Sequence, residues 1–143
     1  MLGRLATWLR LLGYDAVYTP EEGDAELAHR ARREDRILLT RDVELTRRRG
    51  LRFVLIESEQ VERQLEQLAR ELGLTAQEAF SRCAVCNVGL EEASKATVRG
   101  AVPPYVFLTQ DHFRRCPQCD RVYWRGTHWA HMVAQIQDNL AQS

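Results

Sequence analysis

Four cysteines in two pairs are the residues of this sequence whose types and spacing point most directly to chemistry. The pairs are Cys83/Cys86 and Cys116/Cys119, each with the spacing Cys-x-x-Cys. Such a turn presents two thiolates, and two turns that meet give tetrahedral four-sulfur coordination, the usual closed structural zinc site. No coordination position is left open, so we expect Zn²⁺ with a structural role. A redox-active pair or plain buried thiols are the alternatives.

A carboxylate at the end of a short apolar run is the second candidate. Residues 37–39 are Ile, Leu and Leu, and they lead directly into Thr-Arg-Asp at residues 40–42. The pattern predicts a buried strand that brings Asp42 to its carboxyl end, where open α/β sheets keep their functional groups. Asp42 is equally well placed to cap the helix that follows it. Both roles are compatible with the sequence.

Hydrophobic spacing predicts the elements that position these residues. Helices are expected at residues 1–12, 24–33, 43–49 and 59–72, and strands at 14–18, 36–40 and 52–56. This alternation predicts an α/β domain over residues 1–80, with a parallel sheet and right-handed crossovers. From residue 81 the composition changes to turns and short apolar runs, including an expected strand at 105–108. We therefore expect a small zinc ribbon with a C-terminal helix, at about 128–141, within residues 81–143.

Charge and hydropathy narrow the function classes. The chain has 143 residues and a formal net charge of zero, with positive charge concentrated as arginine in residues 29–52. Such a face can hold phosphates, and it is also what a solvated helix surface looks like. We find no membrane-spanning or signal-type stretch. We therefore expect no membrane partner, a cytoplasmic location and reduced cysteines.

Several stretches together resemble the Mut7-C RNase domain family. They are residues 1–15 (MLGRLATWLRLLGYD), residues 37–42 (ILLTRD), Arg82-Cys83-x-x-Cys86-Asn87 with Leu90, and Cys116-x-x-Cys119 followed by Tyr123-Trp124-x-Gly126-x-His128-Trp129. The stretches occur in order and span nearly the whole chain. The resemblance implies a PIN-like α/β domain, with a parallel sheet flanked by helices, fused to a Cys₄ zinc ribbon. It also implies metal-dependent cleavage of RNA.

The resemblance assigns acids to a catalytic Mg²⁺ or Mn²⁺ site. PIN-like relatives carry one acid at the start of the second helix and another after Thr-Arg, which match Asp24 and Asp42. Asp15 and, with lower priority, Glu44 are further candidates. A divalent ion held there would activate water and neutralise charge at phosphorus. Plainer explanations are a helix cap for Asp24, a strand start for Asp15 and a solvated first-turn acid for Glu44.

RNA is the partner that the resemblance implies. Arg4, Arg10 and Arg41 are candidate phosphate contacts, because arginines hold an RNA backbone without reading its sequence. Tyr123 and Trp124 either stack on bases or pack the ribbon against the α/β domain, and we favour packing. Self-association and a regulatory protein partner are further options.

The family pattern also places a strand ending in Asp upstream of the Met-Leu-Gly helix, in the middle of the sheet. We therefore expect the natural protein to begin upstream of Met1. Pairing of exposed strands with another molecule, or a rearranged fold, are the alternatives. A sheet without its middle strand would have unpaired backbone groups and a cleft in its core. Without that acid, the alternative function is a non-catalytic RNA- or ribosome-binding zinc-ribbon protein.

Overall fold

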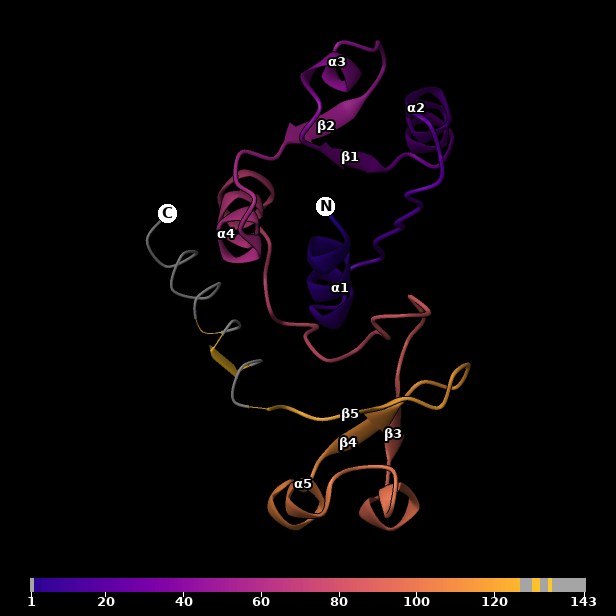
Figure 1. Ribbon diagram of the computed structural model, residues 1–143, viewed down its shortest axis with the longest axis vertical. Coiled ribbons are helices and arrows are strands. Elements are labelled where there is room, and N and C mark those ends of the chain that lie inside the picture. Colours follow the sequence, from indigo (N-terminus) through magenta and orange to yellow (C-terminus); the bar gives the residue numbers. More distant parts are fainter. Residues whose placement is uncertain (1, 127–129, 132–133, 135–143) are drawn as a thin grey trace.

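An α/β part and a small antiparallel ribbon lie at opposite ends of an elongated molecule (Figure 1). This computed structural model describes residues 2–126, 130, 131 and 134. The α/β part consists of α1 (Gly3–Leu11), α2 (Asp24–Arg33), β1 (Ile37–Thr40), α3 (Val43–Thr46), β2 (Arg52–Leu55) and α4 (Val61–Leu72). Most of the helix expected at 128–141 lies outside the described residues. No helix in the described part of the chain is long and apolar enough to span a membrane.

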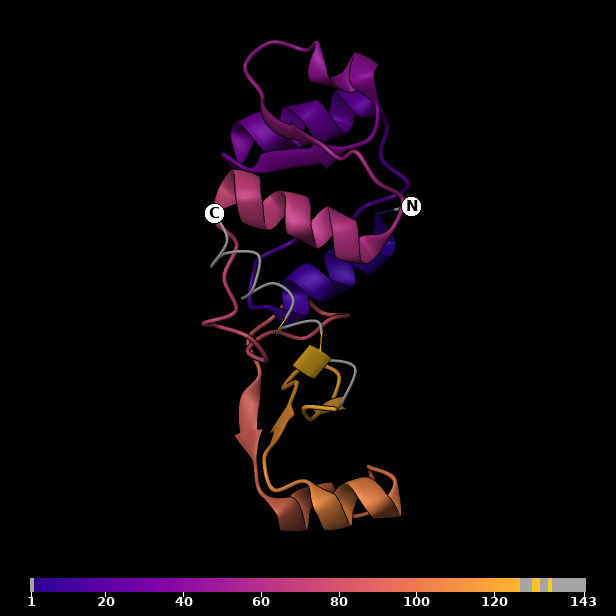
Figure 2. The same cartoon turned by 90° about the vertical axis from the view of Figure 1, so that its left-hand side faces the viewer.

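The sheet of the α/β part has two parallel strands. β1 pairs with β2 in the register Ile37↔Arg52 to Thr40↔Leu55. Figure 1 and Figure 2 show α1 and α4 on the same side of this sheet, and the two helices contact each other. Apolar residues of all these layers form the main core, with Leu5, Leu65 and Leu68 each 1 % exposed. The helical spacing of α4 places Leu65 and Leu68 on one face, and burying that face fixes α4 against both neighbours.

The prediction of a strand at residues 14–18 is wrong. Residues 14–19, here called the cavity segment, are irregular. In the middle of the segment, backbone groups bond to side chains and not to a strand, since Arg10 Nε donates to Ala16 O (2.8 Å) and Ala16 N donates to Asn87 Oδ1 (3.3 Å). In the described part of the chain, β1 therefore pairs with β2 alone and its other edge has no strand partner.

The ribbon is a three-stranded antiparallel sheet with two short helices at its far end. Its elements are β3 (Glu91–Ala93), the 3₁₀ helix η1 (Lys95–Val98), α5 (Pro104–Thr109), β4 (Phe113–Arg115) and β5 (Val122–Tyr123), with strand order β3-β4-β5. A second, smaller core lies between the sheet and these helices, and consists of Val98, Val102, Val106 and Phe113.

The prediction of a strand at residues 105–108 is also wrong, because these residues belong to α5. Pro104 occupies the first position of this helix, where the fixed φ of proline favours helix formation. Val106 is buried at 2 % exposure, whereas Tyr105 and Leu108 are 70 % and 76 % exposed. The apolar run therefore contributes one face of a short helix to the ribbon core.

Aromatic residues join the ribbon to the α/β part. Tyr123 and Trp124 pack against the main core, and Trp124 also contacts the ribbon core. Tyr123 meets Phe80 edge to face, with ring centroids 6.4 Å apart. The packing interpretation of Tyr123 and Trp124 is thus confirmed.

Candidate metal centre and acidic cavity

The four cysteines of the ribbon meet at one point. All four Sγ atoms lie within 4.8 Å of one another, and no disulfide joins them. The sulfur atoms of Cys83 and Cys119 are 3.8 Å apart. Tetrahedral coordination with Zn–S bonds of about 2.3 Å requires sulfur pairs roughly 3.8 Å apart, so the arrangement fits. The cluster can therefore bind a structural metal such as zinc.

Both Cys-x-x-Cys turns have the same backbone design. The residue after each pair, Asn87 or Asp120, has a left-handed conformation, with φ of 59° and 63°. Its N–H donates back to the carbonyl oxygen of the first cysteine, at 3.0 Å in the first turn and 2.9 Å in the second. The second cysteine of each pair donates its N–H to the sulfur of the first, at 3.4 Å. Asn and Asp tolerate the left-handed region better than other residues with a Cβ, which explains their places here.

Hydrogen bonds and burial set the protonation of the thiols. A hydrogen bond from the Arg121 backbone lowers the pKa of Cys119 to about 6, so this sulfur is a thiolate at neutral pH. Burial raises the pKa of Cys86 to about 12. A bound metal ion coordinates the deprotonated form, so binding at Cys86 releases a proton.

Tyr123 is also a partner of the cluster, a role beyond the base stacking or packing expected from the sequence. Its hydroxyl lies 3.1 Å from Cys83 Sγ and accepts a hydrogen bond from Ala84 N at 3.1 Å. Burial raises the pKa of Tyr123, so the hydroxyl keeps its proton and can donate it toward the sulfur. No spacing rule in the sequence indicates this contact, because it depends on how β5 packs beside the first turn.

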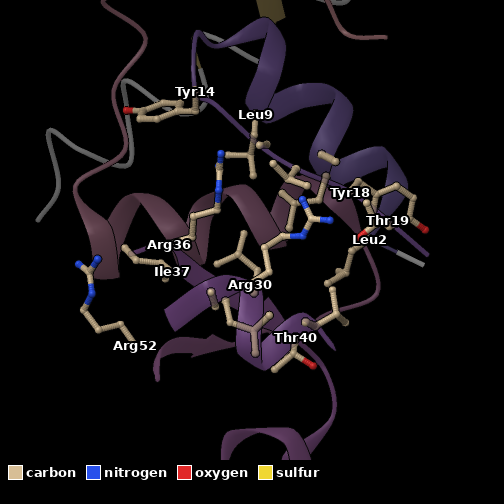
Figure 3. Close-up of a pocket in the computed structure, with 18 of the residues that line it drawn as sticks. Leu2, Leu9, Tyr14, Tyr18, Thr19, Arg30, Arg36, Ile37, Thr40 and Arg52 are labelled. Atoms are coloured by element: carbon tan, nitrogen blue, oxygen red, sulfur yellow. The ribbon is translucent and has the colours of Figure 1, made fainter. Parts of the chain in front are cut away.

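A cavity of about 1060 Å³ lies between α1, α2, α4, β1 and the cavity segment. Figure 3 shows Leu9 of α1 and Thr40 of β1 on different sides of this space. Much of the lining is apolar, from Leu2, Leu5, Leu9, Leu68, Leu72 and Leu74. The lining also includes Leu38 and Leu39 of β1, the strand whose second edge is unpaired in the described chain. A cleft of the kind expected from the sequence is therefore present beside β1.

Asp24 and Asp42 both line this cavity. Asp24 is the first residue of α2, but Gly23 is the N-cap and no side chain caps the helix. Asp42 is the N-cap of α3, and its Oδ1 accepts a hydrogen bond from Glu44 N at 3.0 Å. The capping role of Asp42 is confirmed, and its second carboxylate oxygen takes no part in the cap. A metal-binding role for the two acids stays a prediction.

Asp15 lies at the other end of β1. Its carboxylate pairs with Arg36, at 3.1 Å, and accepts a hydrogen bond from Asn87 Nδ2 at 2.7 Å. Because Arg36 precedes β1 and Asp42 follows it, Asp15 and Asp42 are separated along this strand. The hydrogen bond from Arg36 holds the pKa of Asp15 below its usual range.

The predicted acids do not gather into one cluster. Glu44 forms an exposed ion pair with Arg47 at 3.1 Å, and it does not line the cavity. Among the described residues, the four cysteines are the one group of three or more side chains close enough to bind a metal together. Asp15, Asp24 and Asp42 all line the one cavity, but Asp15 lies at the other end of β1, so Asp24 and Asp42 form at most part of a metal site.

The three predicted phosphate contacts have different surroundings. Arg41 lines the cavity; its Nη1 is buried without a hydrogen-bond partner in the described chain. Arg10 donates from Nε to Ala16 O and from Nη1 to Ala84 O, both at 2.8 Å, and thereby ties α1 to the first cysteine turn. Arg4 is exposed on α1. Of these three arginines, only Arg41 therefore lines the cavity that Asp24 and Asp42 line.

Ion pairs occupy much of the arginine-rich stretch at residues 29–52. Arg30 pairs with Glu22, Arg36 with Glu34 at 2.8 Å, and Arg52 with Asp35 at 2.8 Å. Less unpaired positive charge is available there than the sequence suggests. The basic stretch by itself does not define a phosphate-binding face.

Comparison with known proteins places the chain in a family. The sequence model described as the Mut7-C RNAse domain matches residues 1–136, which include the cavity acids and all four cysteines. No curated protein and no solved structure matches the chain. The family match extends over nearly all of the 143 residues and agrees with the motifs identified in the sequence. This chain belongs to the Mut7-C RNase domain family.

Proposed function

We propose that the protein is a metal-dependent ribonuclease with a PIN-like α/β domain, in which Asp24 and Asp42 bind Mg²⁺ or Mn²⁺. Membership of the Mut7-C RNase domain family supports a nuclease or RNA-related role. The observation that carries the proposal is that both carboxylates line one cavity; Asp15 lines it too, but its carboxylate is engaged by Arg36 and Asn87. Carboxylate oxygens are the ligands that these hard cations prefer.

Two buried polar atoms of the same cavity support a phosphate ligand. Arg41 Nη1 and Thr19 Oγ1 are buried and have no hydrogen-bond partner among the described residues. A buried donor without a partner costs free energy, and a phosphate oxygen would satisfy it. Arg41 follows Thr40 at the end of β1, and its other terminal nitrogen, Nη2, lies 3.9 Å from a carboxylate oxygen of Glu59. Arg41 would bind and orient the RNA backbone while Asp24 and Asp42 hold the metal ion.

Hydrolysis of a phosphodiester needs little from the protein beyond the carboxylates that hold the metal ion and the arginine that holds the RNA backbone. A divalent ion bound to these carboxylates supplies a nucleophilic water and neutralises charge at phosphorus. The N-cap bond to Glu44 N fixes the Asp42 carboxylate, so its position does not depend on the ligand. Asp15 is engaged by Arg36 and Asn87, and we assign it a positioning role.

Cleavage of a labelled RNA in Mn²⁺ or Mg²⁺ tests the proposal. Asp42→Asn should abolish cleavage while α3 stays capped, because the Asn side-chain oxygen can still accept from Glu44 N. Asp24→Asn should have the same effect. The control is Asp111→Asn, which changes an exposed acid of the ribbon that pairs with Lys95. Cleavage that survives in Asp42→Asn would overturn the proposal.

A non-catalytic RNA-binding role is the second candidate. It is favoured by the observation that the described acids form no group of three metal ligands. Binding of this kind should weaken steeply with salt and persist in EDTA. Absence of RNA retention at low salt would exclude it. For either function we propose zinc at the cysteine cluster and a cytoplasmic location, where the four thiols stay reduced.

A further inference from the structure

We propose that Asn87 is a positioning residue that couples metal binding at the four-cysteine cluster to the order of the cavity segment, residues 14–19. The residue belongs to the first cysteine turn by its backbone and to the α/β part by its side-chain contacts. The inference rests on these contacts and on the cysteine cluster. It holds whether the protein cleaves RNA or only binds it.

The backbone of Asn87 is part of the metal-binding turn. Its N–H donates to Cys83 O at 3.0 Å, and its carbonyl oxygen accepts from Arg82 Nη1 at 2.7 Å. Its φ of 59° is set by the way the turn closes. The position of the Asn87 side chain therefore follows from the fold of this turn.

The side chain of Asn87 binds the cavity segment with both of its polar atoms. Nδ2 donates to Asp15 Oδ1 at 2.7 Å, and Oδ1 accepts from Ala16 N at 3.3 Å. Asp15 and Asn87 are 72 positions apart in the sequence. The Ala16 amide has no sheet partner in the described chain, since the segment is irregular, so Asn87 supplies the hydrogen bond that a strand would otherwise supply.

The contacts continue from Asp15 to β1. Asp15 Oδ2 pairs with Arg36 Nη2 at 3.1 Å, and Arg36 immediately precedes β1. Arg10 provides a parallel link, because it binds the carbonyl oxygens of Ala84 in the turn and Ala16 in the segment. The first turn, the segment and the start of β1 are thus joined by consecutive polar contacts, and Asp15, Ala16 and Arg36 in this series line the cavity.

Metal binding controls this network because it holds the turn together. A module as small as the ribbon has little core of its own, and a structural metal supplies much of its folding free energy. When the metal leaves, the turn loses the constraint between Cys83 and Cys86, and Asn87 loses its fixed position. The coupling is reciprocal, so a disturbed cavity segment must weaken metal binding by the same factor.

Backbone hydrogen exchange of the zinc-loaded full chain tests the proposal. Asn87→Gly keeps the left-handed backbone accessible and removes the side chain. We expect faster exchange in residues 14–19 with one zinc still bound. The matched control is Asp120→Gly, at the equivalent position of the second turn, where the side chain is exposed and forms no hydrogen bond or ion pair with the described residues. It should leave the segment unchanged.

A second variant changes Asp15, the partner of Asn87 in the cavity segment. Asp15→Ala leaves the cysteine turn intact, and we expect it to lower zinc affinity at least about fivefold in a chelator competition, as the reciprocity of coupling requires. Its effect should be smaller in an Asn87→Gly background than in the natural sequence. Unchanged exchange in zinc-loaded Asn87→Gly, or equal effects of the two glycine variants, would overturn the proposal. If Asn87→Gly does not retain zinc, unchanged zinc affinity in Asp15→Ala overturns it.

Discussion

The two cysteine turns have the same local backbone but different surroundings. In each, a left-handed residue closes the turn, and the two φ values differ by only a few degrees. The first turn contacts the α/β part through Asn87 and is braced by the Tyr123 hydroxyl against Cys83. In the second turn, Pro117, Gln118 and Asp120 are exposed. The same sequence motif thus forms two different turns in one metal cluster. We call the first, at Cys83 and Cys86, the docked turn, because it contacts the α/β part, and the second, at Cys116 and Cys119, the solvent-facing turn.

This difference separates what a motif determines from what its surroundings determine. The Cys-x-x-Cys spacing determines the turn and the thiolate pair in both cases. The docked turn gains further roles because its following residue, Asn87, has an amide that can both donate and accept. Asp120 has a carboxylate, which only accepts, and its side chain is exposed. We therefore expect mutations that spare the ligands to matter more in the first turn than in the second.

Loss of a ligand should have the largest effect and should affect both turns equally. We expect Cys83→Ser and Cys119→Ser each to lose stoichiometric zinc, because a closed structural site needs all four sulfurs. Apparent binding free energies at such sites are about 10–16 kcal/mol, so the ribbon should unfold in both variants. Metal content per chain and circular dichroism would measure this. Retention of one zinc per chain by either variant would contradict the shared cluster.

Loss of the tyrosine hydroxyl should affect only the docked turn. Tyr123→Phe removes the partner of Cys83 Sγ and leaves Ala84 N unpaired. Groups that orient metal ligands typically contribute about 10- to 100-fold in affinity, and we expect a decrease in this range. Competition with a zinc chelator would measure it. Tyr105→Phe is the control, since Tyr105 is 70 % exposed on α5. Equal affinity of the two variants would show that the hydroxyl does not support the site.

Arg10 and Arg4 both belong to α1, but Arg10 is hydrogen-bonded to the docked turn, whereas Arg4 is exposed. Arg10→Ala removes the bonds to Ala16 O and Ala84 O, and we expect a loss of about 1–2 kcal/mol in the free energy of unfolding. Arg4→Ala should change it by less than about 0.5 kcal/mol, because Arg4 is exposed. Urea unfolding of zinc-loaded protein would measure both. If Arg10 is chiefly a phosphate contact, its variant will instead lose RNA affinity at unchanged stability.

The elements with clear periodicity were predictable from sequence. The helix starting at Asp24 and ending at Arg33 agrees at both bounds, and α4 ends at Leu72, because the left-handed conformation of the following Gly73 (φ 70°) stops the helix. Two apolar stretches were not predictable in this way. In the cavity segment, the backbone groups of Ala16 form hydrogen bonds with Arg10, which belongs to α1, and with Asn87, which is far away in the sequence. The helix α5 begins at a proline, whose fixed φ favours the first helical position.

The candidate sites were predictable to different degrees for a physical reason. Four thiolates with fixed spacing have few alternative uses, so the cysteine cluster followed from the sequence, and the structure brings it together. Acids have many uses, and the structure separates Asp15 from Asp42 by placing them at opposite ends of β1. Asn87 was visible only as part of a family motif. Its role depends on a contact between segments 72 residues apart, which no local pattern encodes.

The smallest expected effect is the pH dependence of the docked turn. Arg36 and Asn87 lower the pKa of Asp15 in the folded protein. A lowered folded-state pKa means that the Asp15 carboxylate stabilises the protein above its unfolded pKa, about 3.9, and that this contribution is lost as the pH falls through the folded value. Asp15→Asn should therefore be less stable than the natural sequence at pH 6, by less than about 1 kcal/mol because the carboxylate is half-exposed.

The difference between Asp15→Asn and the natural sequence should shrink as the pH falls below about 4. Urea unfolding of both proteins at a series of pH values would measure this, with the zinc content checked at each pH so that metal loss is not mistaken for titration of Asp15. A constant difference down to pH 3 would show that the side chain acts through its shape and hydrogen bonds alone. The docked turn would then be held to the α/β part by neutral contacts of Asn87 and by Arg10, and the charge of Asp15 would have no part in it.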